Sequence, residues 1–242
     1  METDFIPLEL DEEFQFACSP EVPCFNQCCR DINQYLTPYD IYRLKNRLNM
    51  TSGDFLNKYT VEHIGPQTGL PIVSLKALPR EDLRCPFVSD EGCQVYEDRP
   101  ASCRTYPLAR AVSQSRETGQ LVENYALMQE PHCKGFGQKK VQTVREWIRD
   151  QEIEEYNRFN DMLMTIISLK NQNKRSPLDL REQHLFRLAL YDLDAFKDHL
   201  EKNGVPEELR LRESEREALR TDERQLLAFA HRWLQWMLFG RA

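Results

Sequence analysis

The sequence lacks long apolar runs, an excess of basic residues and the features of a secretory signal. No stretch approaches the roughly 18 uninterrupted apolar residues of a membrane-spanning helix. The net charge of -7 disfavours binding to nucleic acids and to anionic membrane surfaces, because both attract clustered Lys and Arg. The first residues, METDFIPLELDEEFQF, contain neither a basic segment nor an apolar run. We therefore expect a cytoplasmic protein without nucleic-acid or membrane partners.

The familiar cofactor and catalytic motifs are absent from the sequence as well. It contains no GxGxxG fingerprint, no P-loop, no HExxH zinc motif and no GxSxG nucleophile elbow. It also has no internal repeats and no low-complexity segment. Whether the protein is an enzyme therefore stays open, and no catalytic residue is predicted.

Cysteine is abundant but unevenly distributed. All eight cysteines lie between Cys18 and Cys133, and residues 134–242 contain none. Because cytoplasmic thiols stay reduced, such a pattern indicates a metal site or catalysis before disulfides. Two alternatives are disulfides in an exported chain and burial of some cysteines as small apolar side chains. The shift in composition predicts a cysteine-cluster metal-binding region over residues 1–138 and a helical region over 139–242 that packs on it.

Local signals predict several elements in the first region. Capping patterns predict two helices, which begin at Thr37 and Thr51. The run GLPIVSLKAL, bounded by Gly69 and Pro79, predicts a strand. Apolar runs on either side of residues 115–119 predict a β-hairpin.

The second region has the periodicity of helices. A capping box at Thr143 predicts a helix start, and apolar residues continue at helical spacing over 147–167 and 185–200. Residues 225–239 predict a packed terminal helix, and the charged residues 208–224 predict a solvated helix or linker. The expected fold is mostly α, with a small irregular α+β metal-organised region and a C-terminal helical bundle.

The thiols are the candidate metal ligands. A structural zinc ion takes four nitrogen or sulfur ligands, and a 4Fe–4S cluster takes four thiolates. In an extended segment the adjacent side chains of Cys28 and Cys29 would point to opposite faces. Either the pair divides between two sites, or one member ligates and the other is a nearby spare thiol; two sets of four thiols favour two sites. The predicted metal ligands are Cys18, Cys24, Cys28, Cys29, Cys85, Cys93, Cys103 and Cys133.

A four-thiolate site that holds Zn²⁺ or an oxidised 4Fe–4S cluster has a net charge of about -2, so its sulfurs need hydrogen bonds or positive charges nearby. Arg99 and Arg104 lie on either side of Cys103 and are the predicted residues around the cofactor. Tyr96 and Tyr106 are expected to shield the site from water. The alternative for each arginine is an ordinary surface salt bridge.

Histidines are the other candidate soft ligands. His132 is next to a cysteine and His63 precedes the predicted strand, but both are left outside the ligand set because surface or core histidines are commoner. The remaining histidines lie on predicted helices and are expected to be structural: His184, His199 and His231.

The string CPFVSDEGCQVYEDRPASCRTYPLAR closely resembles the C-P-F…G-C-x-(V/I)-Y-x-x-R-P-x-x-C-R-x-x-P signature of the zinc- or iron-chelating cysteine-cluster proteins, often called YkgJ-like. Upstream, CSPEVPCFNQCCR resembles that family's C-x-x-C-x-x-C-C block, with gaps of five and three residues here in place of two and two. The similarity covers about residues 14–136. The resemblance implies iron or zinc binding, and flagellin lysine-N-methylases contain a related cysteine block.

Three functions follow from these observations. The first is a metal-binding protein that holds an iron–sulfur cluster or iron through all-cysteine ligation, with a redox, metal-handling or accessory role. The second is a metal-scaffolded enzyme that modifies proteins, as the methylase relatives suggest. The third is a zinc-stabilised adaptor whose C-terminal helices bind a protein partner.

Overall fold

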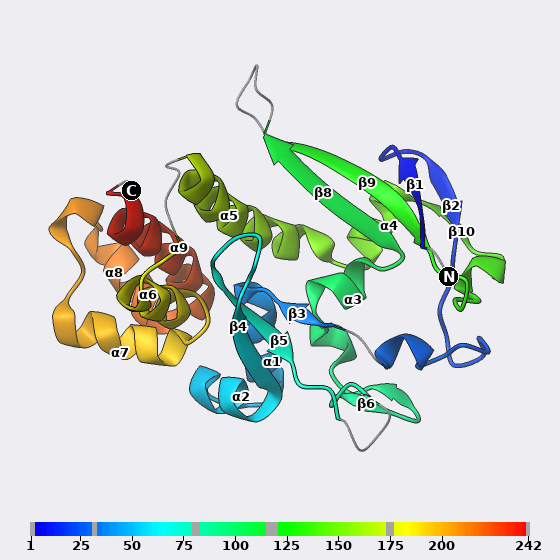
Figure 1. Ribbon diagram of the computed structural model, residues 1–242, viewed down its shortest axis with the longest axis horizontal. Helices are drawn as coiled ribbons and strands as arrows, with labels where there is room; N and C mark the ends of the chain where they lie inside the picture. Colours follow the sequence, from blue (N-terminus) through cyan, green and yellow to red (C-terminus); the bar gives the residue numbers. More distant parts are fainter. Residues whose placement is uncertain (1–2, 31–32, 79–82, 115–120, 173–176, 241–242) are drawn as a thin grey trace. The chain divides into compact units, whose positions relative to one another are not determined.

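The computed structural model describes residues 3–30, 33–78, 83–114, 121–172 and 177–240 (Figure 1). The chain divides into two compact units. Unit 1 consists of Met1–Ile32 and Ala77–Asn157, and unit 2 consists of Asn33–Lys76 and Arg158–Ala242. The stretch between the two groups of cysteines therefore packs with the C-terminal helices. The predicted end of the metal-binding region at residue 138 depends on which cysteines bind metal, and it stays a prediction.

Unit 1 is built from short elements. Its strands form one three-stranded antiparallel sheet in the order β1-β9-β8 and two antiparallel pairs, β10-β2 and β6-β7 (Figure 1). The strands are β1 (Asp4–Leu8), β2 (Glu13–Gln15), β6 (Val88–Ser89), β7 (Gly92–Cys93), β8 (Leu108–Gln114), β9 (Leu121–Gln129) and β10 (Val141–Thr143). The helices are the 3₁₀-helices η1 (Gln27–Cys29), η3 (Tyr96–Asp98) and η4 (Gly135–Gly137), and the α-helices α3 (Ala101–Thr105) and α4 (Val144–Asp150).

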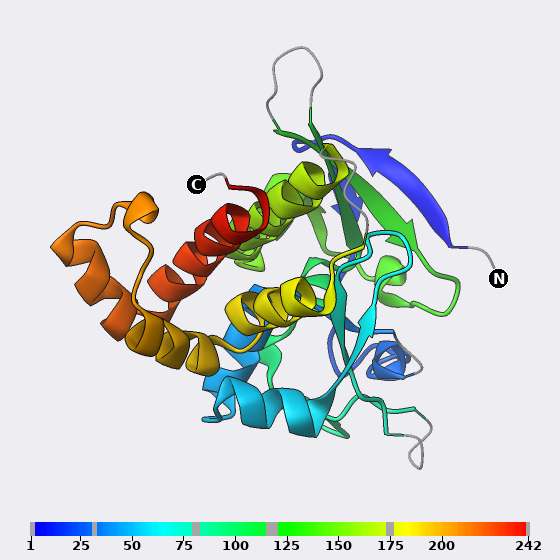
Figure 2. The same ribbon diagram turned by 60° about the vertical axis from the view of Figure 1, so that its left-hand side comes forward.

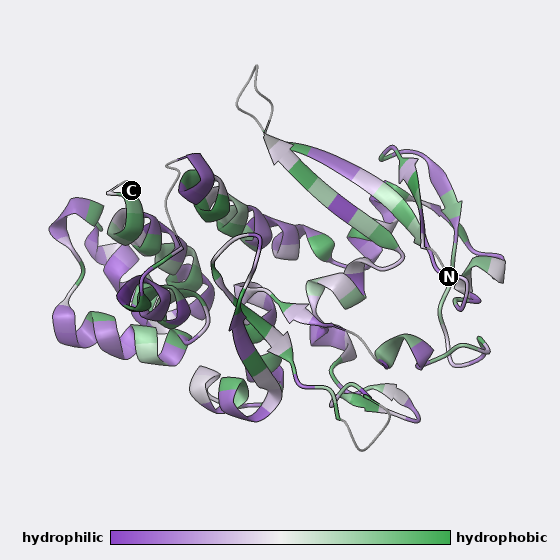
Figure 3. Ribbon diagram, viewed as in Figure 1, coloured by the Kyte–Doolittle hydropathy of each residue, from purple (hydrophilic) through white to green (hydrophobic). Residues whose placement is uncertain are grey.

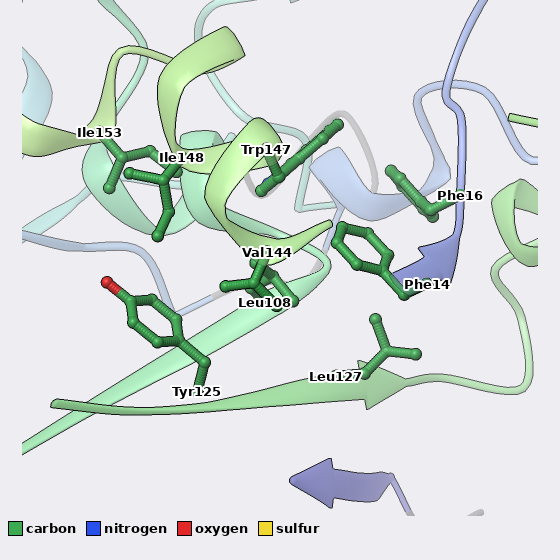
Figure 4. Packing of buried hydrophobic residues seen from close by; sticks show 9 residues of the cluster. All are labelled: Phe14, Phe16, Leu108, Tyr125, Leu127, Val144, Trp147, Ile148 and Ile153. Carbon is green, nitrogen blue, oxygen red and sulfur yellow. The ribbon is translucent and has the colours of Figure 1, made fainter. Parts of the chain in front are cut away.

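The predicted hairpin is present as β8 and β9, although its connection over residues 115–119 lies outside the described residues. Leu108 pairs with Leu127, so alternate residues of both strands face α4. Trp147 of α4 lies against them and donates a hydrogen bond from Nε1 to the carbonyl oxygen of Thr105 at 3.0 Å. Figure 4 shows this core, which comprises Phe14, Phe16, Leu108, Tyr125, Leu127, Val144, Trp147, Ile148 and Ile153.

Unit 2 contains the longer helices and a small antiparallel sheet in the order β3-β5-β4. Helix α5 (Ile153–Gln172) begins in unit 1 and continues in unit 2. The other elements of unit 2 are β3 (Tyr35–Leu36), α1 (Pro38–Arg47), α2 (Ser52–Tyr59), β4 (Thr60–Ile64), β5 (Pro71–Leu75), α6 (Leu180–Leu190), α7 (Leu193–Asn203), η5 (Glu207–Leu209), α8 (Glu213–Thr221) and α9 (Glu223–Phe239).

Helix α9 is the centre of the C-terminal run of helices, and α6, α7 and α8 each pack against it (Figure 2). Its apolar side chains are buried, as predicted for a packed terminal helix. Helix α7 is mostly hydrophilic in Figure 3 and buries only the apolar stripe Leu193, Phe196 and Leu200. None of α8 is buried, which confirms the predicted solvated segment.

Most predicted boundaries are confirmed where a cap defines them. Thr37 and Thr143 each close a capping box, and Thr51 accepts a hydrogen bond at the start of α2. The predicted strand is β5, whereas Pro79 lies outside the described residues. Two helical stretches are divided, one at Glu152, where φ is 50°, and one before α7. Apolar spacing continues across both breaks, so periodicity did not reveal them.

The predicted mixture of helices with a smaller β part is confirmed, but strands are more extensive than the hairpin and the one further strand predicted from the sequence. The part of the chain that the structure describes contains four small antiparallel sheets. In that same part no helix is long and apolar enough to cross a membrane.

Candidate metal centre

All eight cysteines belong to unit 1, and none of them forms a disulfide. Cys18, Cys28 and Cys103 are exposed and the others are half-buried, so metal ions in solution can reach them. Most sit in turns and at the ends of short elements instead of inside the sheet or α4. The site is therefore assembled from loops that the core holds at their ends.

The segment CFNQCC folds as a tight turn. Its 3₁₀-helix η1 is entered through Asn26, which has a left-handed backbone with φ 65°. Asparagine tolerates this conformation better than most residues. The extended geometry assumed for Cys28 and Cys29 is therefore wrong, because a 3₁₀ turn does not place successive side chains on opposite faces.

Asn26 also fastens this turn to the loop between β6 and β7. Its side-chain amide donates hydrogen bonds to the carbonyl oxygens of Ser89 at 3.0 Å and Asp90 at 3.4 Å. The ring of Phe25 lies against Gly92, whose φ is +122° and where an added Cβ would be 3.1 Å from the ring. Glycine is required there both by backbone conformation and by this close approach.

One group of cysteines surrounds this junction. The backbone N–H of Cys85 donates to the carbonyl oxygen of Cys29 at 2.8 Å. Cys93 pairs with Val88 in the β6-β7 ladder, and the Val88 N–H donates to the Cys85 carbonyl at 3.3 Å. These bonds bring Cys29, Cys85 and Cys93 together from segments more than fifty residues apart.

A second group lies around the turn that follows β9. The backbone N–H of Lys134 donates to Sγ of Cys24 at 3.1 Å, so Cys24 lies beside Cys133. The N–H of Ala17, next to Cys18, donates to the carbonyl oxygen of Gly135 at 3.2 Å. A Cβ on Gly135 would lie 2.5 Å from the ring of Phe16, so only glycine allows these two segments to approach so closely.

The thiols influence one another electrostatically. A hydrogen bond from the Cys29 thiol lowers the pKa of Cys28 to about 7, against the opposing effect of burial, and the same bond raises the pKa of Cys29 far above its ordinary value. Burial, together with the smaller effect of the negative charges of Cys28, Cys24 and Cys133, raises the pKa of Cys18 to about 11. The bond from Cys29 thus favours the thiolate form of Cys28.

Arg99 lies within electrostatic reach of two cysteines, and its role around a cofactor stays a prediction. Its guanidinium stacks over Tyr96 at 3.9 Å and donates hydrogen bonds to the Tyr96 carbonyl and the Gln151 side chain. Burial lowers the pKa of Arg99, whereas the nearby thiolates of Cys103 and Cys93 raise it. Arg99 therefore places a positive charge beside these two cysteines.

Arg104 points elsewhere. Its side chain is only 3% exposed, and it donates to the carbonyl oxygens of Gln151 and Glu97, each at 2.5 Å. The guanidinium also stacks over Tyr156 at 4.9 Å. These contacts join η3 and α3 to the start of α5, which is a structural task.

Tyr96 and Tyr106, the two tyrosines expected to shield the site from water, differ in their exposure. Tyr96 is 54% exposed and therefore shields little. The ring of Tyr106 is half-buried against Phe16, with centroids 5.8 Å apart. Burial raises the pKa of Tyr106, and the adjacent Cys133 thiolate raises it further, so this neutral hydroxyl faces Cys133.

His132, next to Cys133, is partly exposed and lies 3.8 Å from the carboxylate of Glu130. His63 is on β4 in unit 2, and so belongs to the unit without cysteines. His231 is fully buried in unit 2.

Chemically the donor set fits zinc or iron. Thiolates are soft ligands that select these metals over magnesium or calcium. Within the described residues no three or more Cys, His, Asp or Glu side chains already stand in the geometry of a metal site. Hydrogen bonds between the loops bring the cysteine-bearing segments of unit 1 together.

The chain belongs to the CxxCxxCC family, described as "Putative zinc- or iron-chelating domain", whose profile matches residues 17–140. The match includes all eight cysteines and confirms the resemblance drawn from the sequence, although it does not carry the label YkgJ-like. Comparison with curated proteins and with solved structures found no match.

Sequence reasoning missed the residues that hold the loops in place. Asn26 had a usable signal, since asparagine before a cysteine pair is suited to a left-handed turn. Gly92 is the glycine of the signature quoted above, whereas Gly135 had no signal, because the ring that approaches it comes from a distant segment.

Proposed function

We propose that this protein holds iron as an iron–sulfur cluster through all-cysteine ligation and has a redox, metal-handling or accessory role in the cytoplasm. The single observation that carries the proposal is the gathering of eight cysteines without disulfides in one unit of a protein whose family is described as zinc- or iron-chelating. One structural zinc ion needs only four ligands, so eight thiols are more than a zinc scaffold requires.

The surrounding groups suit thiolate ligands. The Lys134 N–H donates to Cys24 Sγ, and Arg99 supplies positive charge next to Cys93 and Cys103. Such contacts offset the negative charge of a thiolate site. A bound 4Fe–4S cluster would supply one-electron transfer, and the exposed thiols would place it near the surface.

The test is elemental analysis of protein purified without oxygen. We expect a brown protein that contains iron and acid-labile sulfide in equal amounts, with little zinc. A colourless protein that contains zinc and no sulfide would contradict the iron–sulfur proposal. Replacement of all eight cysteines by serine is the control for metal that adheres elsewhere.

A zinc-stabilised adaptor is the second candidate, because the family description names zinc beside iron. Helix α8 contributes nothing to the buried core and so offers a free surface to a protein partner. Stoichiometric zinc without sulfide would favour this function. The protein-modifying enzyme rests on the resemblance to the methylases alone, and we propose no catalytic residue.

A further inference from the structure

Contacts between the loops of unit 1 bring the segments of six cysteines into two groups, with the adjacent pair Cys28 and Cys29 between them, although within the described residues no three thiols already form a metal site. On one side, the Lys134–Cys24 and Ala17–Gly135 hydrogen bonds bring together the segments of Cys18, Cys24 and Cys133. On the other side, Cys85 and Cys93 share the β6-β7 hairpin, and Arg99 lies near both Cys93 and Cys103. Three thiols are one short of the four that a zinc ion or a 4Fe–4S cluster takes.

The adjacent pair supplies one missing ligand to each group. Cys29 belongs with the second group, because its carbonyl oxygen accepts the N–H of Cys85 and its thiol is influenced by Cys85 and Cys103. Cys28 is the strongest thiolate influence on Cys18. It also influences Cys85 and Cys93, as expected of a thiol at the junction, so its place in the first group is part of the proposal and is tested by the double variants below.

We propose that the region holds two metal centres that are joined at the Cys28–Cys29 peptide bond. Centre 1 would use Cys18, Cys24, Cys28 and Cys133, and centre 2 would use Cys29, Cys85, Cys93 and Cys103. This assignment rests on the proposed metal binding and deepens it by stating which thiols share a metal. It replaces the argument from extended geometry, since the division now follows from the neighbours of each cysteine.

The test is titration of the full-length, metal-free, reduced protein with Co²⁺, whose tetrahedral thiolate complexes absorb visible light. We expect two equivalents for the wild type. Cys24→Ser and Cys85→Ser should each bind one, because serine keeps the volume and replaces a soft thiolate with a poor ligand. Gln27→Ala, an exposed change in the same turn as the pair, is the matched control and should bind two.

Double variants test which thiols share a metal centre. Cys24→Ser with Cys133→Ser should still bind one equivalent, since both remove centre 1, whereas Cys24→Ser with Cys85→Ser should bind none. Cys28 and Cys29 are tested in the same way, each in combination with Cys24→Ser. Cys24→Ser with Cys28→Ser should retain one equivalent, and Cys24→Ser with Cys29→Ser should retain none.

Each other outcome has a definite meaning. A wild type that binds no Co²⁺ would overturn the proposed metal binding itself. One equivalent in the wild type, or a same-centre double variant that binds none, would overturn the two-centre assignment and leave metal binding intact. Far-UV circular dichroism monitors the helices of unit 2, and a single variant that loses helicity is replaced by another member of the same centre. Loss of both equivalents in every single variant would also overturn the assignment.

Discussion

The two units of this protein are stabilised in different ways. Unit 2 has long helices around α9 and a continuous set of buried apolar side chains. In unit 1 the core lies between α4 and the strands, and Cys133 packs against it, whereas residues 18–30 and 83–104 contribute no member to it. Over the described residues 18–30 and 83–104, the buried apolar side chains are only Val22, Phe87 and Val95.

This difference indicates which part of the protein needs the free energy of metal binding in order to fold. Loops that bury little apolar surface cannot offset the conformational entropy lost on folding. Metal binding to thiolates can supply that free energy directly. Asn33–Lys76 lies between the cysteines in sequence but packs in unit 2, so it should not share this dependence.

Metal removal should therefore have the largest effect, and it should be confined to the cysteine loops. Zinc binding contributes about 10–16 kcal/mol in small zinc domains. After chelation under reducing conditions, amide hydrogen exchange should accelerate strongly over residues 18–30 and 83–104. Residues 33–76 and helices α6 to α9 should keep their protection. An equal loss of protection in residues 33–76 would contradict the division.

The reverse experiment weakens unit 2 alone. Phe159 is 1% exposed and stacks on Tyr39 with ring centroids 4.5 Å apart. Phe159→Ala should lower the free energy of unfolding of unit 2 by about 3–5 kcal/mol, as measured by urea denaturation, because it leaves a cavity. Leu180→Ala, at a position 84% exposed on α6, is the control and should change it by less than about 0.5 kcal/mol. Metal content should stay the same in both variants, and a drop in Phe159→Ala would show that the units depend on each other.

Acid should weaken unit 2 through His231. This side chain donates from Nδ1 to the carbonyl oxygen of Leu227 at 2.8 Å, and burial lowers its pKa to about 4. The unfolded chain has the ordinary pKa of about 6.5, so it binds a proton first as the pH falls. Stability present above pH 6.5 should therefore decline by roughly 3 kcal/mol as the pH falls to about 4.

The slope of stability against pH measures this contribution. His231→Gln should flatten the slope between pH 6.5 and pH 4, since an amide stays neutral, and hydrogen exchange of α9 reports it locally. His184→Gln changes an exposed histidine on α6 and should leave the slope as in the wild type. Identical slopes in all three proteins would exclude His231 as the cause.

The smallest expected effect concerns the turn that joins the cysteine loops. Asn26→Ala removes the hydrogen bond to Ser89 and places a less tolerant residue at φ 65°. These losses together amount to about 1–2 kcal/mol, or roughly a tenfold weaker affinity for Co²⁺ in competition with a chelator. Asn26→Gly retains the backbone freedom and should lose less. Affinities equal to wild type in both variants would mean that the turn is held by other contacts.

The sequence predicted features whose causes lie within one or two turns of chain. The capping boxes at Thr37 and Thr143 join residues three positions apart, so α1 and α4 begin where expected. The apolar run of α9 and the two strands of the hairpin also carry their own patterns. The expectation of zinc or iron followed from the clustered thiols, because soft thiolate ligands select these metals whichever loops carry them.

Features that depend on distant segments could not be predicted. The sequence suggested similar roles for Arg99 and Arg104, and it did not indicate that Arg104 would donate hydrogen bonds to the backbone carbonyls of Gln151 and Glu97. The breaks before α5 and α7 were hidden by apolar spacing that continues across them.

The sequence by itself therefore determined that this is a helical protein with a thiol-rich, metal-chelating region. The tertiary structure decided which thiols are neighbours: the contacts of Cys24 with Lys134 and of Cys29 with Cys85 close loops of more than fifty residues. It also placed Asn33–Lys76 with the C-terminal helices. The physical reason is that local signals act through adjacent backbone groups. Long-range neighbours are selected by the packing of the whole chain, which repays the entropy of loop closure.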